Sequence, residues 1–284
     1  MSDLVESIGV ARARRPIPFR LALGGCLLAI IVLAVLFAPL ISSYDPTRQT
    51  LSNALLAPGS PGHLLGTDNV GRDIFTRLLY GGRYTVGIAL LATTLGAIVG
   101  VAVGATAGFF RGVLEAVIMR TTDALLAFPS ILIAFVVVAI LGTGTNSLIW
   151  AMMIYAVPIF VRFSYTATLP LMSHDLIEAS RARGASNLRI LCRHVVPNIL
   201  PEIIILWTLR LGAVAILVSS LSYVGLGVTP PAPEWGAMLG QGSQYLSYAP
   251  TLVLAPGIAI SVLIIAFNLI GDGLRDYIDP RSKR

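Results

Sequence analysis

Six long apolar segments run through this chain, near residues 21–41, 84–108, 124–142, 148–161, 203–227 and 251–271. A helix of about 20 apolar residues is long enough to cross the hydrocarbon layer of a bilayer. The fourth segment is short as a strictly apolar run, and we expect it to continue through Arg162 and Phe163. The pattern predicts an integral membrane protein with six transmembrane spans.

The low content of charged residues supports this prediction. Charged side chains make up 12% of the chain and hydrophobic ones 56%, whereas a soluble domain is about a quarter charged. The first apolar segment follows Arg12, Arg14, Arg15 and Arg20, as the apolar core of a signal peptide would. It is longer than the usual core of about 7–15 residues and lacks a clean Ala-x-Ala cleavage site. We therefore expect it to be a retained anchor.

The positions of Lys and Arg predict the orientation, because these residues are retained on the cytoplasmic side. With the N-terminus inside, most of the 20 Lys and Arg residues lie in the cytoplasm, and the loops 143–147 and 228–250 carry none. The outside then holds Arg48, Arg72, Arg77 and Arg83, all in one long loop. Both termini are expected in the cytoplasm. The net charge of +6 reflects this topology and an attraction to anionic lipid rather than nucleic-acid binding.

Two kinds of site are not expected in this chain. Cys26 and Cys192 have no Cys or His at ligand spacing, so the sequence indicates neither a metal site nor a disulfide framework. A nucleotide-binding P-loop ends in Gly-Lys-Ser/Thr, and the only lysine, Lys283, is followed by Arg284. We expect no catalytic, metal or cofactor residue here, and any ATP that drives transport is hydrolysed by another polypeptide.

Four glycines repeat every fourth residue in the second apolar segment. They are Gly96, Gly100, Gly104 and Gly108. Glycines at this spacing leave a flat groove on one helix face, which lets another backbone approach closely. The stripe predicts either packing within this subunit or an interface with a second membrane subunit.

A short, polar, basic stretch at residues 173–197 lies between the fourth and fifth apolar segments, on the expected cytoplasmic face. Ser173 or Asp175 can cap a first short helix over residues 176–183, and Gly184 can adopt the left-handed conformation that ends it. Ser186 can cap a second short helix before the fifth span, which begins near Pro197. Two helices bent at a glycine form a compact knob that a partner protein can hold. The alternative is a solvated basic loop.

This stretch resembles the EAA loop of bacterial ABC importer permeases. Glu178-Ala179-Ser180 is followed at the usual spacing by Gly184 and by His194-Val195-Val196-Pro197. Ser180, His194 and Val196 depart from the usual residues, and none of them disturbs the glycine. The resemblance implies that the stretch docks on an ATPase, with Asp175, Glu178, Ala179, Gly184, Arg189 and Pro197 as candidate coupling residues.

Three further motifs resemble the second, or C-type, permease subunit of bacterial dipeptide and oligopeptide ABC importers. They are Leu65 to Asp73, then Leu221 to Gly227 with Glu234-Trp235-Gly236, and Phe267 to Asp276 with Asp279-Pro280-Arg281. The resemblance covers the chain from about residue 20. It implies an all-α type I importer permease of the bacterial inner membrane, with the EAA stretch as its coupling-helix loop.

The same resemblance implies partners and a function. The partners are a second, homologous permease subunit in a heterodimer, two ABC ATPases that hydrolyse ATP, and an extracytoplasmic substrate-binding protein. The implied function is to form the pathway for di- and oligopeptides by alternating access, without covalent chemistry. Nickel, glutathione and heme are alternative cargoes. An ion-driven secondary transporter, which would favour inverted repeats, and a channel or scaffold without energy coupling are the other readings.

Several ionisable or aromatic residues have two interpretations. Asp68, Arg72 and Asp73 could be a ligand cluster, but a capped helix with a local ion pair fits better. Glu234 and Trp235 are candidate contacts for the binding protein. Arg210 lies deep in the fifth span, where an ionisable group usually faces a cavity or a partner. It could line the pathway, pair with an acidic residue of the other permease, or extend to the interface.

The sequence thus divides into four regions. Residues 1–20 form a cytoplasmic tail, and residues 21–83 form the first span and a long extracytoplasmic loop. Residues 84–271 form a five-span core that includes the loop 173–197. Residues 272–284 form a second cytoplasmic tail.

Overall fold

The computed structural model describes residues 17–278, and the predicted tail up to residue 16 and the Asp279-Pro280-Arg281 motif lie outside this range. Every named element in the described range is a helix, as predicted. The long helices are α1 (Phe19–Leu36), α3 (Ile74–Phe110), α4 (Gly112–Ala127), α5 (Ser130–Leu141), α6 (Thr145–Leu171), α9 (Val196–Tyr223) and α11 (Thr251–Ile278). The short ones are α2 (Ala38–Ile41), α7 (Asp175–Ala182), α8 (Asn187–Ile190) and α10 (Trp235–Gly242). In a bilayer such helices satisfy their own backbone hydrogen bonds.

Five helices are long and apolar enough to cross a membrane: α1, α3, α6, the stretch through α8 and α9, and α11. The predicted third span is not a straight helix. α4 and α5 form a pair bent by 94° that would make the sixth span if it crosses as one unit. The bend falls at Phe128, which has an extended backbone conformation. The cause is Pro129, which lacks an N–H and disfavours helical geometry in the residue before it.

The helices differ from the predicted spans mainly at their ends. α3 begins at residue 74 rather than 84, because Asp73 caps it there and its first turns pack on an extracytoplasmic loop. At 37 residues α3 is about 55 Å long, which exceeds the hydrocarbon layer of about 30 Å. α6 continues past Phe163, through which the fourth span was expected to run, to Leu171 and contains Pro158 and Pro170. Polar and proline residues that hydropathy assigns to loops therefore belong to long helices.

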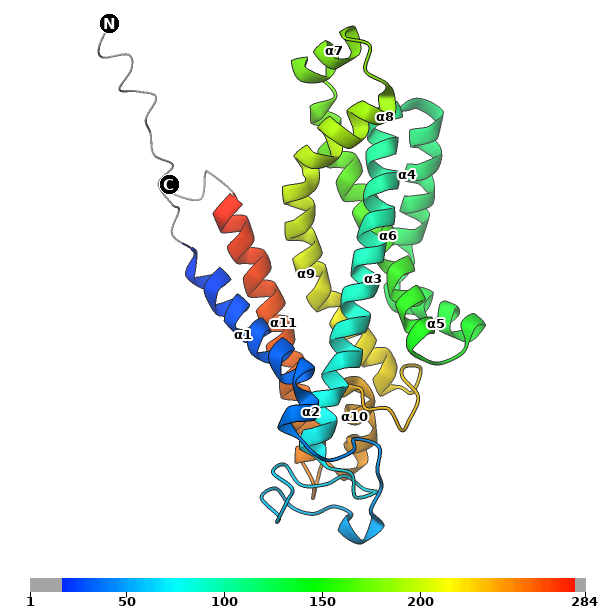
Figure 1. Cartoon of the computed structure of the whole chain (residues 1–284). Coiled ribbons are helices and arrows are strands. Elements are labelled where there is room, and N and C mark those ends of the chain that lie inside the picture. Colours follow the sequence, from blue (N-terminus) through cyan, green and yellow to red (C-terminus); the bar gives the residue numbers. More distant parts are fainter. Residues whose placement is uncertain (1–16, 279–284) are drawn as a thin grey trace, which may run out of the picture.

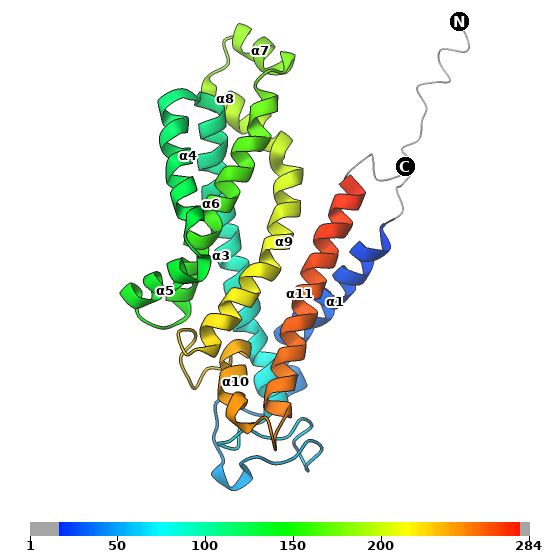
Figure 2. The ribbon, with the colours of Figure 1, turned by 180° about the vertical axis from the view of Figure 1, so that it is seen from behind.

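The two ends of the helix bundle carry different elements. α7 and α8 lie at one end, toward which the described chain ends also point, and the loop between α2 and α3 lies at the other end with α10 (Figures 1 and 2). The positive-inside rule assigns the α7–α8 end to the cytoplasm. α1 packs along α11, and α3 packs closely on α6 and also on α9. One buried apolar cluster fills the extracytoplasmic half around Leu148, Leu211 and Trp235, and a second fills the cytoplasmic half around Phe160, Ile190 and Ile199.

The glycine stripe of α3 is the surface on which α6 lies. A Cβ atom at Gly100 would lie 2.4 Å from the Cβ of Phe160, and one at Gly104 would lie 2.2 Å from the carbonyl oxygen of Val161. Gly96 and Gly108 meet α6 in the same way. At all four positions the neighbouring atoms belong to α6 of the same chain, so the prediction that the stripe packs within this subunit is confirmed. The alternative prediction, that Gly96, Gly100, Gly104 and Gly108 form an interface with a second subunit, is wrong.

Replacing Gly100 with alanine should destabilise the protein by about 1–3 kcal/mol, because the new methyl group overlaps α6 and forces the two helices apart. Gly87 is the matched control on the same helix, since a Cβ there meets nothing within 4 Å. Gly87→Ala should be neutral or stabilise the helix by up to about 1 kcal/mol. Thermal unfolding in detergent measures both. Equal stability of the two variants would contradict the α3–α6 packing described above.

Candidate functional site: the cytoplasmic knob and the extracytoplasmic cap

Residues 173–197, which we call the cytoplasmic knob, form two short helices joined by a tight turn. α7 ends at Ala182 and is followed by Gly184 with a φ of +78°. The N–H of Gly184 donates to the carbonyl of Arg181, and the N–H of Ala185 donates to the carbonyl of Ser180. These two bonds make a Schellman motif, which needs a left-handed residue at the position of Gly184. The predicted glycine turn is therefore confirmed.

The caps of the two short helices follow the prediction at α8 only. The Ser186 side chain accepts a hydrogen bond from the backbone N–H of Arg189 at 3.4 Å, as expected. The predicted cap of α7 by Ser173 or Asp175 is wrong, because the helix begins at Asp175 and His174 holds the cap position without a side-chain bond. The Ser173 hydroxyl donates to Pro170 instead. Asp175 lies in the first turn of α7, where a carboxylate is stabilised by the helix dipole.

One face of the knob is anchored to the membrane helices. Ile177, Ser180 and Ile190 are at most 3% exposed, and the two isoleucines belong to the apolar cluster formed with α3, α6 and α9. The Arg181 guanidinium lies over the ring of Phe109 at the end of α3, 5.5 Å from its centroid. This face of the knob is therefore packed against α3, α6 and α9.

The opposite face of the knob is free to meet another protein. The predicted coupling residues Asp175, Glu178, Ala179, Gly184, Arg189 and Pro197 are all exposed. Sequence reasoning missed Leu176 and Leu188, which are 50% and 70% exposed on the same loop. The sequence feature that could have identified these two leucines is an apolar side chain within a polar cytoplasmic stretch. An exposed surface that combines leucines with charged residues suits protein contact.

The connection from α8 to α9 contains a π-helical turn over Leu191–Val195, which the sequence reading did not predict. Pro197 lies in the first turn of α9, directly after the π-turn, and has no N–H to donate to the preceding helical turn. α8, the π-turn and α9 form one continuous helical path.

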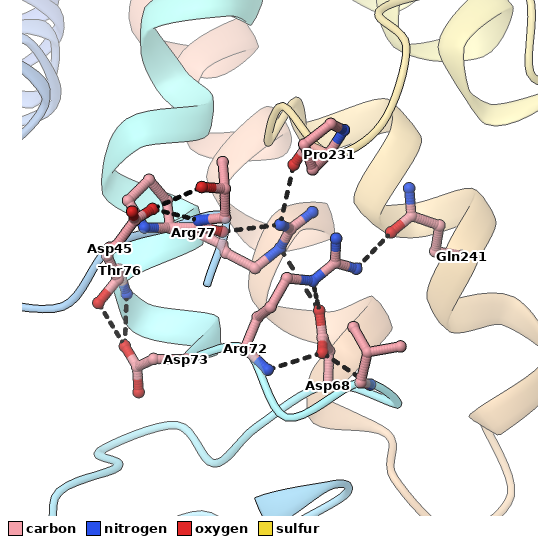
Figure 3. Close-up of polar contacts among 11 residues, drawn as sticks. Asp45, Asp68, Arg72, Asp73, Thr76, Arg77, Pro231 and Gln241 are labelled. Atoms are coloured by element: carbon pink, nitrogen blue, oxygen red, sulfur yellow. Dashed lines mark hydrogen bonds and ion pairs between the residues drawn. The ribbon is translucent and has the colours of Figure 1, made fainter. Parts of the chain in front are cut away.

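At the other end of the molecule, residues 42–73 form what we call the extracytoplasmic cap (Figure 3). Asp68 accepts a hydrogen bond from Arg72 Nε at 2.6 Å and lies 3.6 Å from Arg77 Nε. Asp73 caps α3 by accepting from the N–H and the hydroxyl of Thr76, at 2.7 and 2.6 Å. The predicted helix cap, formed by Asp73 with Thr76, and the predicted ion pair of Asp68 with Arg72 are both confirmed.

Arg77 ties three separate segments together and is only 2% exposed. Its guanidinium donates to the carbonyls of Pro46 and Pro231, at 2.9 and 3.3 Å (Figure 3). Arg72 reaches Gln241 of α10 at 3.2 Å. The cap is therefore fastened to the start of α3 and to the loop that leads into α10.

Glu234 and Trp235 are not exposed, so the prediction that they contact a binding protein is wrong. Glu234 is completely buried, caps α10 through the N–H of Ala237, and accepts a bond from the Thr85 hydroxyl at 2.8 Å. Trp235 is 3% exposed and donates from Nε1 to the carbonyl of Leu78. Both residues fasten α10 to α3, because the loop folds back onto the helices instead of projecting outward.

Arg210 lies in the middle of α9 and is half-buried. Within residues 17–278 its guanidinium makes no hydrogen bond or ion pair, whereas the neighbouring Trp207 donates to Thr94 at 3.2 Å. The structure does not bring Arg210 together with the knob or with the cap. A charge at this depth needs a partner or water, and the described residues supply no partner.

Comparison with known proteins agrees with this arrangement. Residues 100–284 match the family model described as binding-protein-dependent transport system inner membrane component. Residues 21–58 match the N-terminal TM domain of oligopeptide transport permease C. The first match covers the knob, and the second covers α1 and the start of the cap.

Individual relatives extend the likeness to nearly the whole chain. A dipeptide transport system permease protein, DppC of Alkalihalophilus pseudofirmus, is 40% identical over 89% of this chain and 83% of its own. A glutathione transport system permease protein, GsiD of Pectobacterium atrosepticum, is 38% identical over 95% of this chain and 90% of its own. The fold resembles an inward-facing structure of the MetNI methionine ABC transporter, with a TM-score of 0.57 at 21% identity, over 72% of this chain and 97% of that one. The chain belongs to the family of binding-protein-dependent transport system inner membrane components.

Proposed function

We propose that this chain is one of two different permease subunits that form the pathway of an ATP-driven importer for short peptides in the inner membrane. The observation that carries the proposal is the cytoplasmic knob, a rigid protrusion whose inner face is packed on α3, α6 and α9 and whose outer face is exposed. The dipeptide permease relative and the match to oligopeptide permease C support a peptide cargo. Glutathione, itself a tripeptide, is the second candidate because of the glutathione permease relative.

The knob is suited to transmit force rather than to perform chemistry. We infer that two ATPase partners hold it in clefts, hydrolyse ATP and change its position when they close and open. The movement reaches the membrane through α6, which ends just before α7, and through α9, which continues from α8. Cargo arrives from an extracytoplasmic binding protein and passes between this subunit and its partner.

Purification of the chain from its own membranes tests this proposal. We expect two ATPases and a second permease to be recovered with it. Reconstituted with the binding protein, the complex should take up a labelled dipeptide only when ATP is supplied on the ATPase side. Uptake driven by an ion gradient without ATP, or recovery of the chain alone, would overturn the proposal. Competition by unlabelled glutathione against unlabelled dipeptide would identify the preferred cargo.

Arg210→Ala should reduce peptide uptake at least about tenfold, because the unpaired charge in α9 is proposed to meet either the cargo or the second permease. If Arg210 faces the pathway and attracts the peptide carboxylate, the yield of assembled complex should be unchanged. If it pairs with an acid of the other permease, the yield should fall, since a buried partner would lose its counter-charge. Measuring both peptide uptake and the yield of assembled complex separates the two roles. Wild-type values of both would mean that Arg210 has neither role and only extends to the membrane interface.

A further inference from the structure

The outermost part of the extracytoplasmic cap is formed by residues 48–55, which we call the cap tip. It contains the short 3₁₀ turn η2 (Leu51–Asn53), which lies at the end of the molecule farthest from the cytoplasmic knob in both views (Figures 1 and 2). Leu51 is 73% exposed and Leu55 is 36% exposed. Exposed apolar side chains surrounded by polar residues are typical of surfaces that bind another molecule. The cap tip therefore presents such a surface at the outer end of the chain.

The cap tip lies beyond the lipid headgroups. Arg83 of α3 donates to the carbonyls of Val35 and Leu36, so the outer end of the apolar helix α1 lies beside Arg83. α3 begins about 13 Å farther out, at Ile74, and the cap is fastened to this first turn. The headgroup region is only about 5–7 Å deep on each side of the hydrocarbon layer. The molecule that meets Leu51 is therefore not a lipid.

The cap tip is held in place by its backbone although its side chains are exposed. The N–H of Thr50 donates to the carbonyl of Val70 at 3.1 Å, and the N–H of Leu55 donates to the carbonyl of Asp68 at 3.0 Å. Leu55 has a φ of +57°, a left-handed conformation that glycine adopts without strain and leucine does not. Strained residues that surrounding bonds keep in place are concentrated at functional sites, including binding sites. The exposed surface is thus preorganised.

We propose that the cap tip is a docking surface for the extracytoplasmic substrate-binding protein. The inference rests on the proposed function and adds which surface of this subunit the binding protein meets. The family to which the chain belongs is binding-protein-dependent, so a protein partner reaches it from outside. A second permease packs beside the helices within the membrane, whereas the cap tip lies at their end (Figure 1). The exposed Arg48 beside Leu51 fits a partner surface that combines an apolar recess with acidic side chains.

Leu51→Ser and Leu55→Gly remove the two apolar side chains without breaking the backbone bonds of the cap tip. Leu51 is exposed, and glycine favours the conformation of Leu55. Leu40→Ser is the matched control, because Leu40 is 82% exposed on α2, directly after the membrane helix α1. Uptake of a labelled dipeptide by the reconstituted complex is measured over a range of binding-protein concentrations.

We expect each substitution in the cap tip to raise the half-saturating concentration of the binding protein about five- to tenfold. The maximal rate of uptake should stay within twofold of wild type, because the pathway and the ATPase contacts are unchanged. Leu40→Ser should change the half-saturating concentration less than twofold.

Half-saturating concentrations within twofold of wild type in both Leu51→Ser and Leu55→Gly would overturn the inference. A lower yield of assembled complex with an unchanged half-saturating concentration would also overturn it, and would assign the cap tip to the second permease. Failure of the proposed function would look different, because the wild-type complex would then take up no dipeptide at any concentration of the binding protein.

Discussion

Changing Gly184 to valine should reduce peptide uptake at least about tenfold while the protein still inserts normally. Gly184 has a φ of +78°, and the left-handed conformation costs an L-residue about 1–2 kcal/mol, more for a β-branched one. An added Cβ would meet nothing within 4 Å, so the effect is conformational and not a clash. The turn would open, the bonds to Arg181 and Ser180 would be lost, and α7 would point away from α8. Uptake, membrane level and ATPase retention measure the result.

Asparagine at position 184 is the matched control, because it tolerates the left-handed region better than other residues with a Cβ. Gly184→Asn should keep most of the uptake. Glu178→Lys tests the exposed face independently, since it reverses a charge without altering the turn, and we expect the same loss of ATPase retention. Wild-type uptake and retention in both Gly184→Val and Glu178→Lys would mean that the knob is only a solvated loop.

Removing the Asp68 side chain should be the most destabilising single change outside the membrane helices. Asp68, Arg72 and Arg77 are all at most 6% exposed, so Asp68→Ala leaves two buried guanidinium groups without their shared carboxylate. Breaking a buried pair in this way costs about 3–5 kcal/mol. The cap should loosen from α3 and α10, and thermal unfolding in detergent should begin at a clearly lower temperature.

Asp45 provides the control for this change. It lies in the same cap, is exposed, and its side chain bonds to the nearby Thr47. Asp45→Ala should change the free energy of unfolding by about 0.5 kcal/mol or less. If Asp68→Ala were no worse than Asp45→Ala, the buried ion cluster would not be what holds the cap.

The features that the sequence predicted correctly depend on neighbours in the chain. The Gly184 turn, the Ser186 cap and the Asp68–Arg72 pair each involve residues within five positions of one another, so their signals are local. Hydropathy likewise located the spans, because burial in lipid depends on the composition of one segment.

The sequence reading missed one local feature, the bend at Pro129, and other features that depend on packing between distant segments. Residues 124–142 are apolar throughout, and hydropathy does not register that Pro129 bends them by 94°. Glu234 and Trp235 lie in a loop that reads as external, and only their contacts with Thr85 and Leu78 of α3 bury them. The partner of the glycine stripe was undecided for the same reason, since the stripe itself does not say which helix lies on it.

The length of α3 has a mechanical consequence. Its first turn is clamped by Asp73 and Arg77 outside the membrane, and its last turn meets Arg181 of the knob through Phe109. An unbroken helix of about 55 Å behaves as a lever, so a tilt of about 5° displaces one end by about 5 Å relative to the other. If the lever pivots within the membrane, its two ends move in opposite directions. The same motion would then widen the passage on one side while narrowing it on the other, and no separate gate would be needed to keep the two sides out of phase.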